Sequence, residues 1–256
     1  MPNPFALFAD PLTLTLLALY GGLSLWEALR PARPLPPVPH WRLRGLACFL
    51  IFLAVSTWLP LLWNDQLARW RLFDLTGLGS VGGALVGLLV YEAGVYAWHR
   101  AMHRSDLLWL WFHQWHHSAE RLDVAGAFWF SPLDMLGWTV LASLALTLVV
   151  GITPQAVTAV VVGTTLLSLV QHANLRTPRW LGWWIQRPES HSRHHARGVH
   201  AGNYADLPLF DVLFGTFENP ARFAEEAGFW PGASARVRAM LLGRDLAFPD
   251  TRTRPI

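Results

Sequence analysis

The sequence has few charged residues and no lysine. Of its 256 residues, 53% are hydrophobic and 14% are charged, whereas about a quarter of the residues in a typical soluble domain are charged. All 20 basic residues are arginines, and the net charge is only +3. The arginines are scattered beside apolar segments and form no basic stripe of the kind that binds nucleic acid. We therefore expect no nucleic-acid partner.

Cysteine is nearly absent, and no cleavable leader is recognisable. Because Cys48 is the single cysteine, neither an intramolecular disulfide nor a cysteine-based metal site can form. The first residues lack a short apolar core between a basic stretch and a small-residue cleavage site. We therefore expect the first apolar segment to remain in the protein.

Long segments without any charge are the main feature of the sequence. They cover residues 11–26, 45–64, 75–91 and 135–170. A membrane-spanning helix needs about 20 mostly apolar residues, so the first three segments fit one span each and the fourth fits two. A soluble protein with buried helices is the alternative, but the remaining polar sequence is too scarce to cover such a core. We predict an all-α membrane protein with five spans, over about residues 12–29, 46–63, 78–98, 133–150 and 155–171.

The connector between the first two spans indicates the orientation. Residues 30–39 contain arginine and several prolines but no acidic residue, and loops of this composition lie in the cytoplasm. Alternating spans then bring residues 99–123, and everything after 171, to the same side. We therefore expect a multi-pass membrane protein with a cytoplasmic, histidine-rich helical cap.

Ten of the eleven histidines lie between positions 99 and 200, in a regular pattern. Residues three and four apart share one face of a helix, so each cluster can aim two or three imidazoles at a single point. Packed imidazoles repel one another when protonated, whereas a metal ion replaces the protons and turns crowding into binding. Nine histidines suffice for two ions with four or five ligands each, although imidazole alone does not choose among zinc, copper, iron and nickel. The nine predicted ligands are His99, His103, His113, His116, His117, His172, His191, His194 and His195.

These motifs resemble the fatty acid hydroxylase and sterol desaturase superfamily of membrane di-iron enzymes. That family has H-x3-H, H-x2-H-H, a histidine after a hairpin of spans, and a final H-x2-H-H. This chain reads YAWHRAMH over 96–103, WFHQWHHS over 111–118, QHAN over 171–174 and PESHSRHH over 188–195, followed by NY at 203–204 and FDVLFGTF over 210–217. The resemblance covers about residues 80–220. The chain departs from the family pattern at Ser131, where many members have a histidine, at Glu92 for aspartate, and at Ala205 for glycine.

The resemblance implies a function and a cofactor. It implies an oxidoreductase in which the nine histidines hold two iron ions (with zinc possible in the purified protein). O2 is then the co-substrate, and a lipid-like substrate is hydroxylated or desaturated. A separate reductase or ferredoxin-like protein is expected to supply electrons. It also implies three units: residues 1–77 with two spans and the connector, 78–220 as the catalytic domain, and 221–256 as a cytoplasmic tail.

Neutral imidazole ligands need partners for their second N–H group. Glu92, Asn174 and Asp211 are the candidates for this role, and His200 is read as a loop residue or a further partner. For Glu92, a salt bridge to Arg100 or Arg104 is an equal alternative.

Two other functions compete with the di-iron reading. A membrane zinc hydrolase acting on a lipid amide or ester needs about three histidines and one activated water, which leaves six clustered histidines unexplained. A metal-transport protein needs ionisable residues within several spans, yet the predicted spans are nearly free of charge.

Overall fold

The computed structural model describes residues 9–247, and this part of the chain contains helices and loops but no β-strand. Five of its helices are long and apolar enough to cross a membrane, which confirms the predicted fold class. They are α2 (Pro11–Leu29), α3 (Trp41–Trp58) with η1 (Leu59–Leu62), η2 (Thr76–Leu78) with α5 (Gly79–Arg104), α8 (Pro132–Ser143) with the π-helical η5 (Leu144–Val149), and α9 (Pro154–His172).

Short helices form the remainder of the described chain. One of them, α4 (Asn64–Arg69), lies in the loop between the second and third spans. The others make up the cap: α6 (Asp106–Leu108), the π-helical η3 (Trp109–His113), α7 (Gln114–His117), η4 (Val124–Gly126), η6 (Arg179–Trp183), α10 (Pro188–His194), α11 (Leu209–Leu213), η7 (Ala233–Ala235) and α12 (Val237–Leu241).

Local sequence signals set most helix ends. Asp10, Ser131 and Thr153 each precede a proline in the first turn, and each accepts a hydrogen bond from a backbone N–H of the helix that follows. Such caps satisfy donors that have no partner within the helix. The third span ends later than predicted, at Arg104 rather than near residue 98, because nothing interrupts the helix before Ser105.

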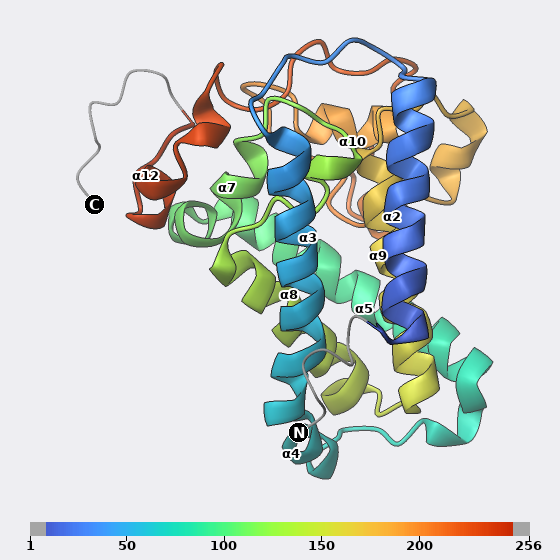
Figure 1. The fold of residues 1–256 in the computed structure, drawn as a ribbon. Helices are drawn as coiled ribbons and strands as arrows, with labels where there is room; N and C mark the ends of the chain where they lie inside the picture. The colour runs from blue at the N-terminus through green and yellow to red at the C-terminus, as the bar shows by residue number, and fades with distance from the viewer. Residues whose placement is uncertain (1–8, 248–256) are drawn as a thin grey trace.

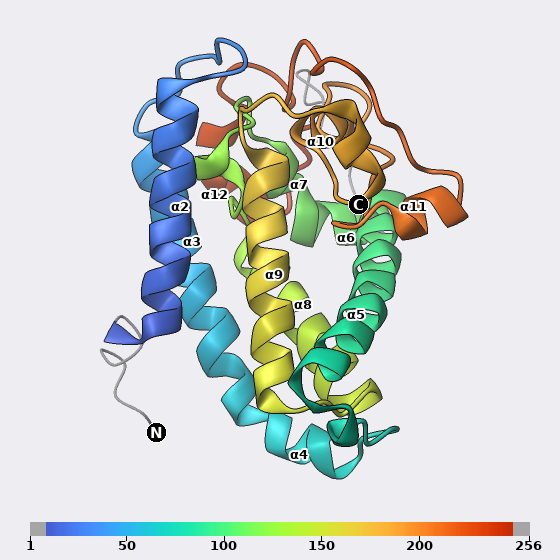
Figure 2. The same ribbon diagram turned by 90° about the vertical axis from the view of Figure 1, so that its right-hand side faces the viewer.

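The spans lie side by side, and the cap closes one end of them (Figure 1). Helix α9 packs between α2 and α5, as Figure 2 shows. Helices α7 and α10 lie at the cap end, and α4 lies at the opposite end. The chain turns sharply between η5 and α9 at Gly151, which has a positive φ of 54°, and a Cβ there would lie 2.3 Å from the Phe73 carbonyl oxygen. Only glycine fits both conditions.

The arginine- and proline-rich connector lies at the cap end of the molecule. The Ala32 N–H donates to the Asn174 carbonyl at 2.8 Å, and the Asn174 amide donates to the Arg33 carbonyl at 2.7 Å. The connector and the histidine clusters therefore share one side of the predicted membrane, as the charge pattern indicates. That this side is the cytoplasmic one stays a prediction.

The C-terminal residues pack against the cap. Phe229, Met240 and Leu246 are buried in one core with Trp41 and Trp115. Residues 221–247 are therefore part of the folded cap, where the sequence predicted a tail. The rest of that predicted tail, 248–256, lies outside the described residues.

Candidate metal centre

All nine predicted histidines fall into two groups, in each of which one ring nitrogen per residue lies within 4.8 Å of the others. The five-histidine group consists of His99, His103, His113, His117 and His194. The four-histidine group consists of His116, His172, His191 and His195. The groups adjoin, because the rings of His117 and His195 stack with centroids 4.2 Å apart. Either group is large enough to hold one metal ion.

Each H-x2-H-H motif contributes to both groups. His113 and His117, four residues apart, enter the five-histidine group, while His116 enters the other. The second motif does the reverse, since His191 and His195 enter the four-histidine group and His194 crosses over. Adjacent residues on a helix point about 100° apart, so the middle histidine is directed away from the last one. Two histidines of each motif thus aim at one point, as the spacing predicts, while the third joins the other group, and the two groups interlock.

In the five-histidine group, backbone and carboxylate acceptors fix the proton positions. His99 Nδ1 lies 2.6 Å from the Tyr204 carbonyl oxygen, and His194 Nδ1 lies 2.6 Å from that of Gly202. His113 Nδ1 lies 3.0 Å from Asp134 Oδ2. A neutral imidazole carries one proton, so these rings carry it on Nδ1 and have a lone pair on Nε2. The Nε2 atoms of His103, His117 and His194 are buried without a partner.

In the four-histidine group, one ring is fixed in the same way. His172 Nδ1 lies 2.7 Å from the Ser168 carbonyl oxygen, which leaves the lone pair on Nε2. This Nε2 lies 3.2 Å from His116 Nε2 and 3.1 Å from His191 Nε2. His195 Nε2 in turn lies 3.1 Å from His191 Nε2.

These contacts fit bound metal ions. His99 and His113 face each other with Nε2 atoms 2.9 Å apart, and because both Nδ1 atoms donate elsewhere, this contact brings together two lone pairs. Two lone pairs repel unless a cation lies between them. Nitrogens bound to one ion at about 2.1 Å stand roughly 3 Å apart when they meet at a right angle. The chemistry of the donor set therefore fits metal ions in both groups.

The electrostatic environment keeps the imidazoles ready to bind. Burial, with the proximity of other histidines as the second cause, holds the pKa values of these cap residues well below the ordinary histidine value. The residues are His113, His116, His117, His191, His194 and His195. Neutral imidazole is the form that binds metal, so no proton has to be displaced from these nitrogens at neutral pH.

Sequence reasoning missed Asp134, which is fully buried in the first turn of α8. Its carboxylate accepts the His113 Nδ1 proton, an arrangement that orients a ligand and increases its basicity. Ser131 caps the same helix by accepting the Asp134 N–H at 3.1 Å, and it donates to the Phe112 carbonyl at 2.9 Å. The residue that replaces the family histidine therefore supports Asp134. A single acidic residue at the start of an otherwise apolar span was the available signal.

His200 is in direct contact with the five-histidine group. Its Nδ1 lies 3.0 Å from His117 Nδ1, and its ring packs on Trp109 and Phe229. Burial lowers the pKa of His200 to about 4. Its φ is 44°, a left-handed conformation uncommon for residues other than glycine. His200 thus holds the ring of His117, as one of its two readings from the sequence suggested.

Glu92, Asn174 and Asp211 make no hydrogen bond to a histidine within the described residues. Glu92 accepts the Leu207 N–H at 2.9 Å, and no salt bridge connects it to an arginine. Asn174 bonds the connector. Asp211 accepts the N–H groups of Tyr204 and Ala205 at 2.8 and 2.9 Å, and so supports the loop whose carbonyl holds His99. The direct partner role expected for these three residues is not what the structure has.

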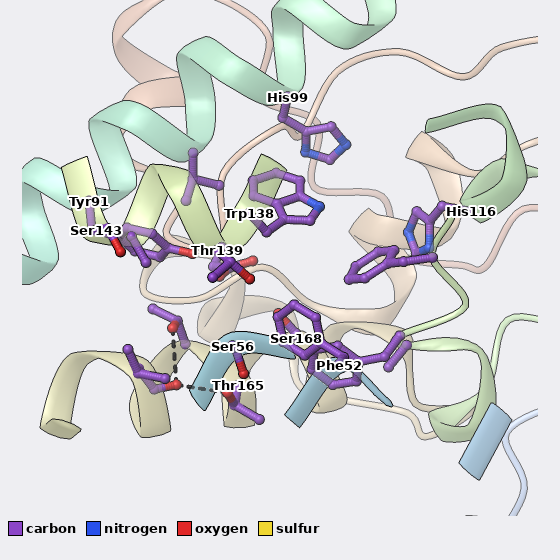
Figure 3. A pocket seen from close by; sticks show the side chains of 18 of the residues that line it. Phe52, Ser56, Tyr91, His99, His116, Trp138, Thr139, Ser143, Thr165 and Ser168 are labelled. Atoms are coloured by element: carbon purple, nitrogen blue, oxygen red, sulfur yellow. Dashed lines mark hydrogen bonds between the residues drawn. The ribbon is translucent and has the colours of Figure 1, made fainter. Parts of the chain in front are cut away.

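A cavity of about 180 Å³ leads from the histidines into the span region. His99, His113, His116, His172 and His191 line one end of it, and Figure 3 shows His99 and His116 there, away from Tyr91 and Ser143. The remaining walls come from α3, α5, α8 and α9 and combine aromatic rings with hydroxyl groups. The lining includes Phe52, Phe130, Trp138, Thr139, Thr164, Thr165 and Ser168. The cavity can thus place a long, mostly apolar molecule against the centre.

The family model for fatty acid hydroxylases matches residues 84–216, more than half of the sequence. The chain belongs to this family. It is also 34% identical over 143 residues to a curated protein of Rhizobium tropici named ornithine lipid hydroxylase OlsE. That alignment covers 54% of this chain and 42% of the relative, so the chain spans less than half of that protein's length. No solved structure matches the chain significantly.

The family assignment confirms the resemblance drawn from the motifs. The matched segment contains most of α5 and all of η3, α7, α8, α9 and α10, and with them all nine histidines of the two groups and most of the residues that line the cavity. The assignment of individual histidines as metal ligands is not tested by the match and stays a prediction.

Proposed function

We propose that this chain is a multi-pass membrane enzyme that uses two iron ions and O2 to hydroxylate a lipid-like substrate. One observation carries the proposal. Nine histidines, eight of them buried and His103 half-buried, form two adjoining groups at the end of a cavity enclosed by the candidate spans. A soluble substrate would need an aqueous entrance, whereas a cavity between spans is accessible to molecules dissolved in the bilayer.

Different residues of the chain would hold the ions, orient the ligands and enclose the substrate. The five-histidine group would hold one ion and the four-histidine group the other. When bound, the irons would supply the activation of O2 and the removal of hydrogen from an unreactive C–H bond. Asp134, the Ser168 carbonyl and two loop carbonyls keep the rings of His113, His172, His99 and His194 in the tautomer that binds metal through Nε2. The apolar walls hold the substrate carbon near His99 and His116 and exclude water, which protects the reaction from side products.

Hydroxylation is the outcome we favour over desaturation, because both the family and the relative are named as hydroxylases. The name of the relative makes ornithine-containing lipids the first substrates to test. We further propose that residues 78–220 form the catalytic unit, that the histidines face the cytoplasm, and that a separate reductase or ferredoxin-like protein supplies electrons. The second span belongs functionally with this unit, since its residues Phe52 and Ser56 line the cavity.

A zinc hydrolase remains the alternative that the metal chemistry has to exclude. It would use about three histidines around one ion, whereas here four and five histidines converge at two points. The number and kind of metal ions per chain therefore separate the two functions.

The test is elemental analysis of the purified protein grown with ample iron. The wild type should contain about two irons per chain. His117→Ala and His116→Ala remove a ligand from different groups, so each should lose mainly one ion. His40→Asn is the matched control, because His40 is exposed and lies outside both groups. One zinc per chain in the wild type would overturn the proposal.

A further inference from the structure

Two buried carboxyl groups near the metal centre have no counter-ion. Eight acidic residues are buried within the described part of the chain. Six of them are held by an arginine, a histidine or at least two hydrogen-bond donors: Glu27, Glu120, Asp123, Asp134, Glu189 and Asp211. The remaining two are Glu92 and Asp206. A buried carboxylate without a cation or sufficient donors is costly, so this pair requires an explanation.

Glu92 and Asp206 are neighbours in space. The Leu207 N–H, which directly follows Asp206, donates to Glu92 Oε2 at 2.9 Å, and each carboxyl group lies within the electrostatic field of the other. Glu92 Oε1 is fully buried and has no hydrogen-bond partner. Asp206 Oδ1 accepts the Gln171 amide at 2.7 Å, and within the described residues no donor reaches its Oδ2. Of these two free oxygens, Asp206 Oδ2 belongs to a residue that lines the cavity, and Glu92 lies outside that lining.

Asp206 faces the cavity at its histidine end. It lines the wall together with Gln171, Tyr204, His172 and His191. Burial raises the pKa of Asp206 to about 7, which is the expected result when a carboxyl group is removed from water without a compensating positive charge. A cation entering the cavity at this point would stabilise the ionised form and use the free oxygens.

We propose that Asp206, supported by Glu92, binds a protonated amino group of the substrate. The lipid then lies in the cavity with its ammonium group beside the metal centre and its apolar chain directed toward the far end. This inference rests on the proposed function, because it takes the cavity to be the lipid site. It adds the chemical class: the substrate is an amine-bearing lipid, and the oxidised carbon lies near the amine.

The geometry favours an amine over other polar groups. An ammonium group offers three donors and a positive charge, which match the free oxygen and the charge of an ionised Asp206. A substrate phosphate or carboxylate has no donor to offer this oxygen. A hydroxyl group could donate one hydrogen bond but would leave the charge of Asp206 uncompensated.

Binding of two probes that differ only in this group tests the inference. Iron-loaded protein in a neutral maltoside detergent is titrated at neutral pH with hexadecylamine or hexadecanol, and occupancy is read by native mass spectrometry. The variants are Asp206→Asn and Glu92→Gln, which keep shape and remove charge. Asp65→Asn, at an exposed position in α4, is the matched control. Metal content is measured for each protein.

The wild type and Asp65→Asn should bind the amine about tenfold or more tightly than the alcohol, in line with a hydrogen bond to a charged group. Asp206→Asn should bind both probes alike while keeping its metal, and Glu92→Gln should reduce the preference. Equal binding of both probes by the wild type would overturn the inference. So would an unchanged preference in Asp206→Asn, or a loss of metal in that variant without a change in preference.

The same experiment separates this inference from the proposed function. Equal binding of both probes in the cavity would remove the amine subsite and leave a lipid hydroxylase with a different substrate class. If neither probe bound, the cavity would not be a lipid site, and both proposals would fail.

Discussion

Replacing Asp134 by asparagine should weaken one metal site and spare the other. The carboxylate accepts the Nδ1 proton of His113 at 3.0 Å in a fully buried position. Asparagine has nearly the same shape and can still accept this bond, but the charge is lost, and charge-assisted hydrogen bonds are about twice as strong as neutral ones. His113 would then be a weaker and less firmly oriented ligand.

The expected loss of metal affinity follows from the effect of similar carboxylates on other metal-binding histidines. Loss of a carboxylate that supports a metal-binding histidine typically costs about 10–100-fold in metal affinity, which corresponds to about 1.4–2.7 kcal/mol. Because Asp134 contacts only His113 among the ligands, the loss should be confined to the five-histidine group. Asp134→Asn should therefore release about one iron per chain at chelator concentrations at which the wild type keeps both.

The assay is a titration with an iron chelator, with remaining metal counted by elemental analysis. Asp65→Asn makes the same chemical change at an exposed position and should behave as the wild type. Circular dichroism confirms that the helices are retained. Identical release curves for Asp134→Asn and the wild type would refute the reasoning, and so would parallel loss of both ions, because the effect would then not be local to His113.

Three further predictions concern the neighbours of the centre. Asparagine at position 200 can adopt the left-handed backbone conformation, but His200→Asn removes the contact with His117. The iron affinity of the five-histidine group should therefore fall about tenfold in the chelator titration. The control His40→Asn, also at a positive φ of 55°, should leave the iron affinity unchanged. Ser168→Phe fills the cavity beside His172, so hydroxylation should fall at least about tenfold with iron content retained, and normal turnover would show that the cavity is not the substrate site. Burial keeps the pKa values of His191, His194 and His195 below their unfolded value of about 6.5, so these groups contribute full stability above that pH and lose it as pH falls. The metal-free protein should therefore have a lower Tm at about pH 5 than at about pH 8. An equal Tm at the two pH values would contradict the burial of these histidines as neutral groups.

The arrangement of spans was predictable because apolar length is a local property. The segments without charge predicted five spans, and the structure contains five candidate membrane-spanning helices. The turn between the last two lies at Gly151. The end of α5 was placed too early because a histidine-containing segment has a polar composition, although His99 and Met102 within it are buried. His99 and His103 belong to the final turns of that span.

The sequence was sufficient to predict which histidines belong to the centre, but not how they are grouped or which residues support them. Spacing identified eight members and the family resemblance added His172, but the division of each H-x2-H-H motif between two groups depends on how α7 and α10 face each other. Partners separated in sequence were also missed. Asp134 lies 21 residues from His113, and Asp206 lies 35 residues from Gln171, and no local pattern connects them.

The most direct test of the proposed function is the origin of the oxygen atom in the product. Purified iron-loaded protein, supplied with reductant and a lipid that it turns over, is incubated under heavy-isotope O2 in ordinary water, and the product is analysed by mass spectrometry. We expect one heavy oxygen atom in the hydroxylated lipid, and none when the label is supplied as water. A product that takes its oxygen from water would contradict the proposed O2-dependent hydroxylation and indicate hydrolysis.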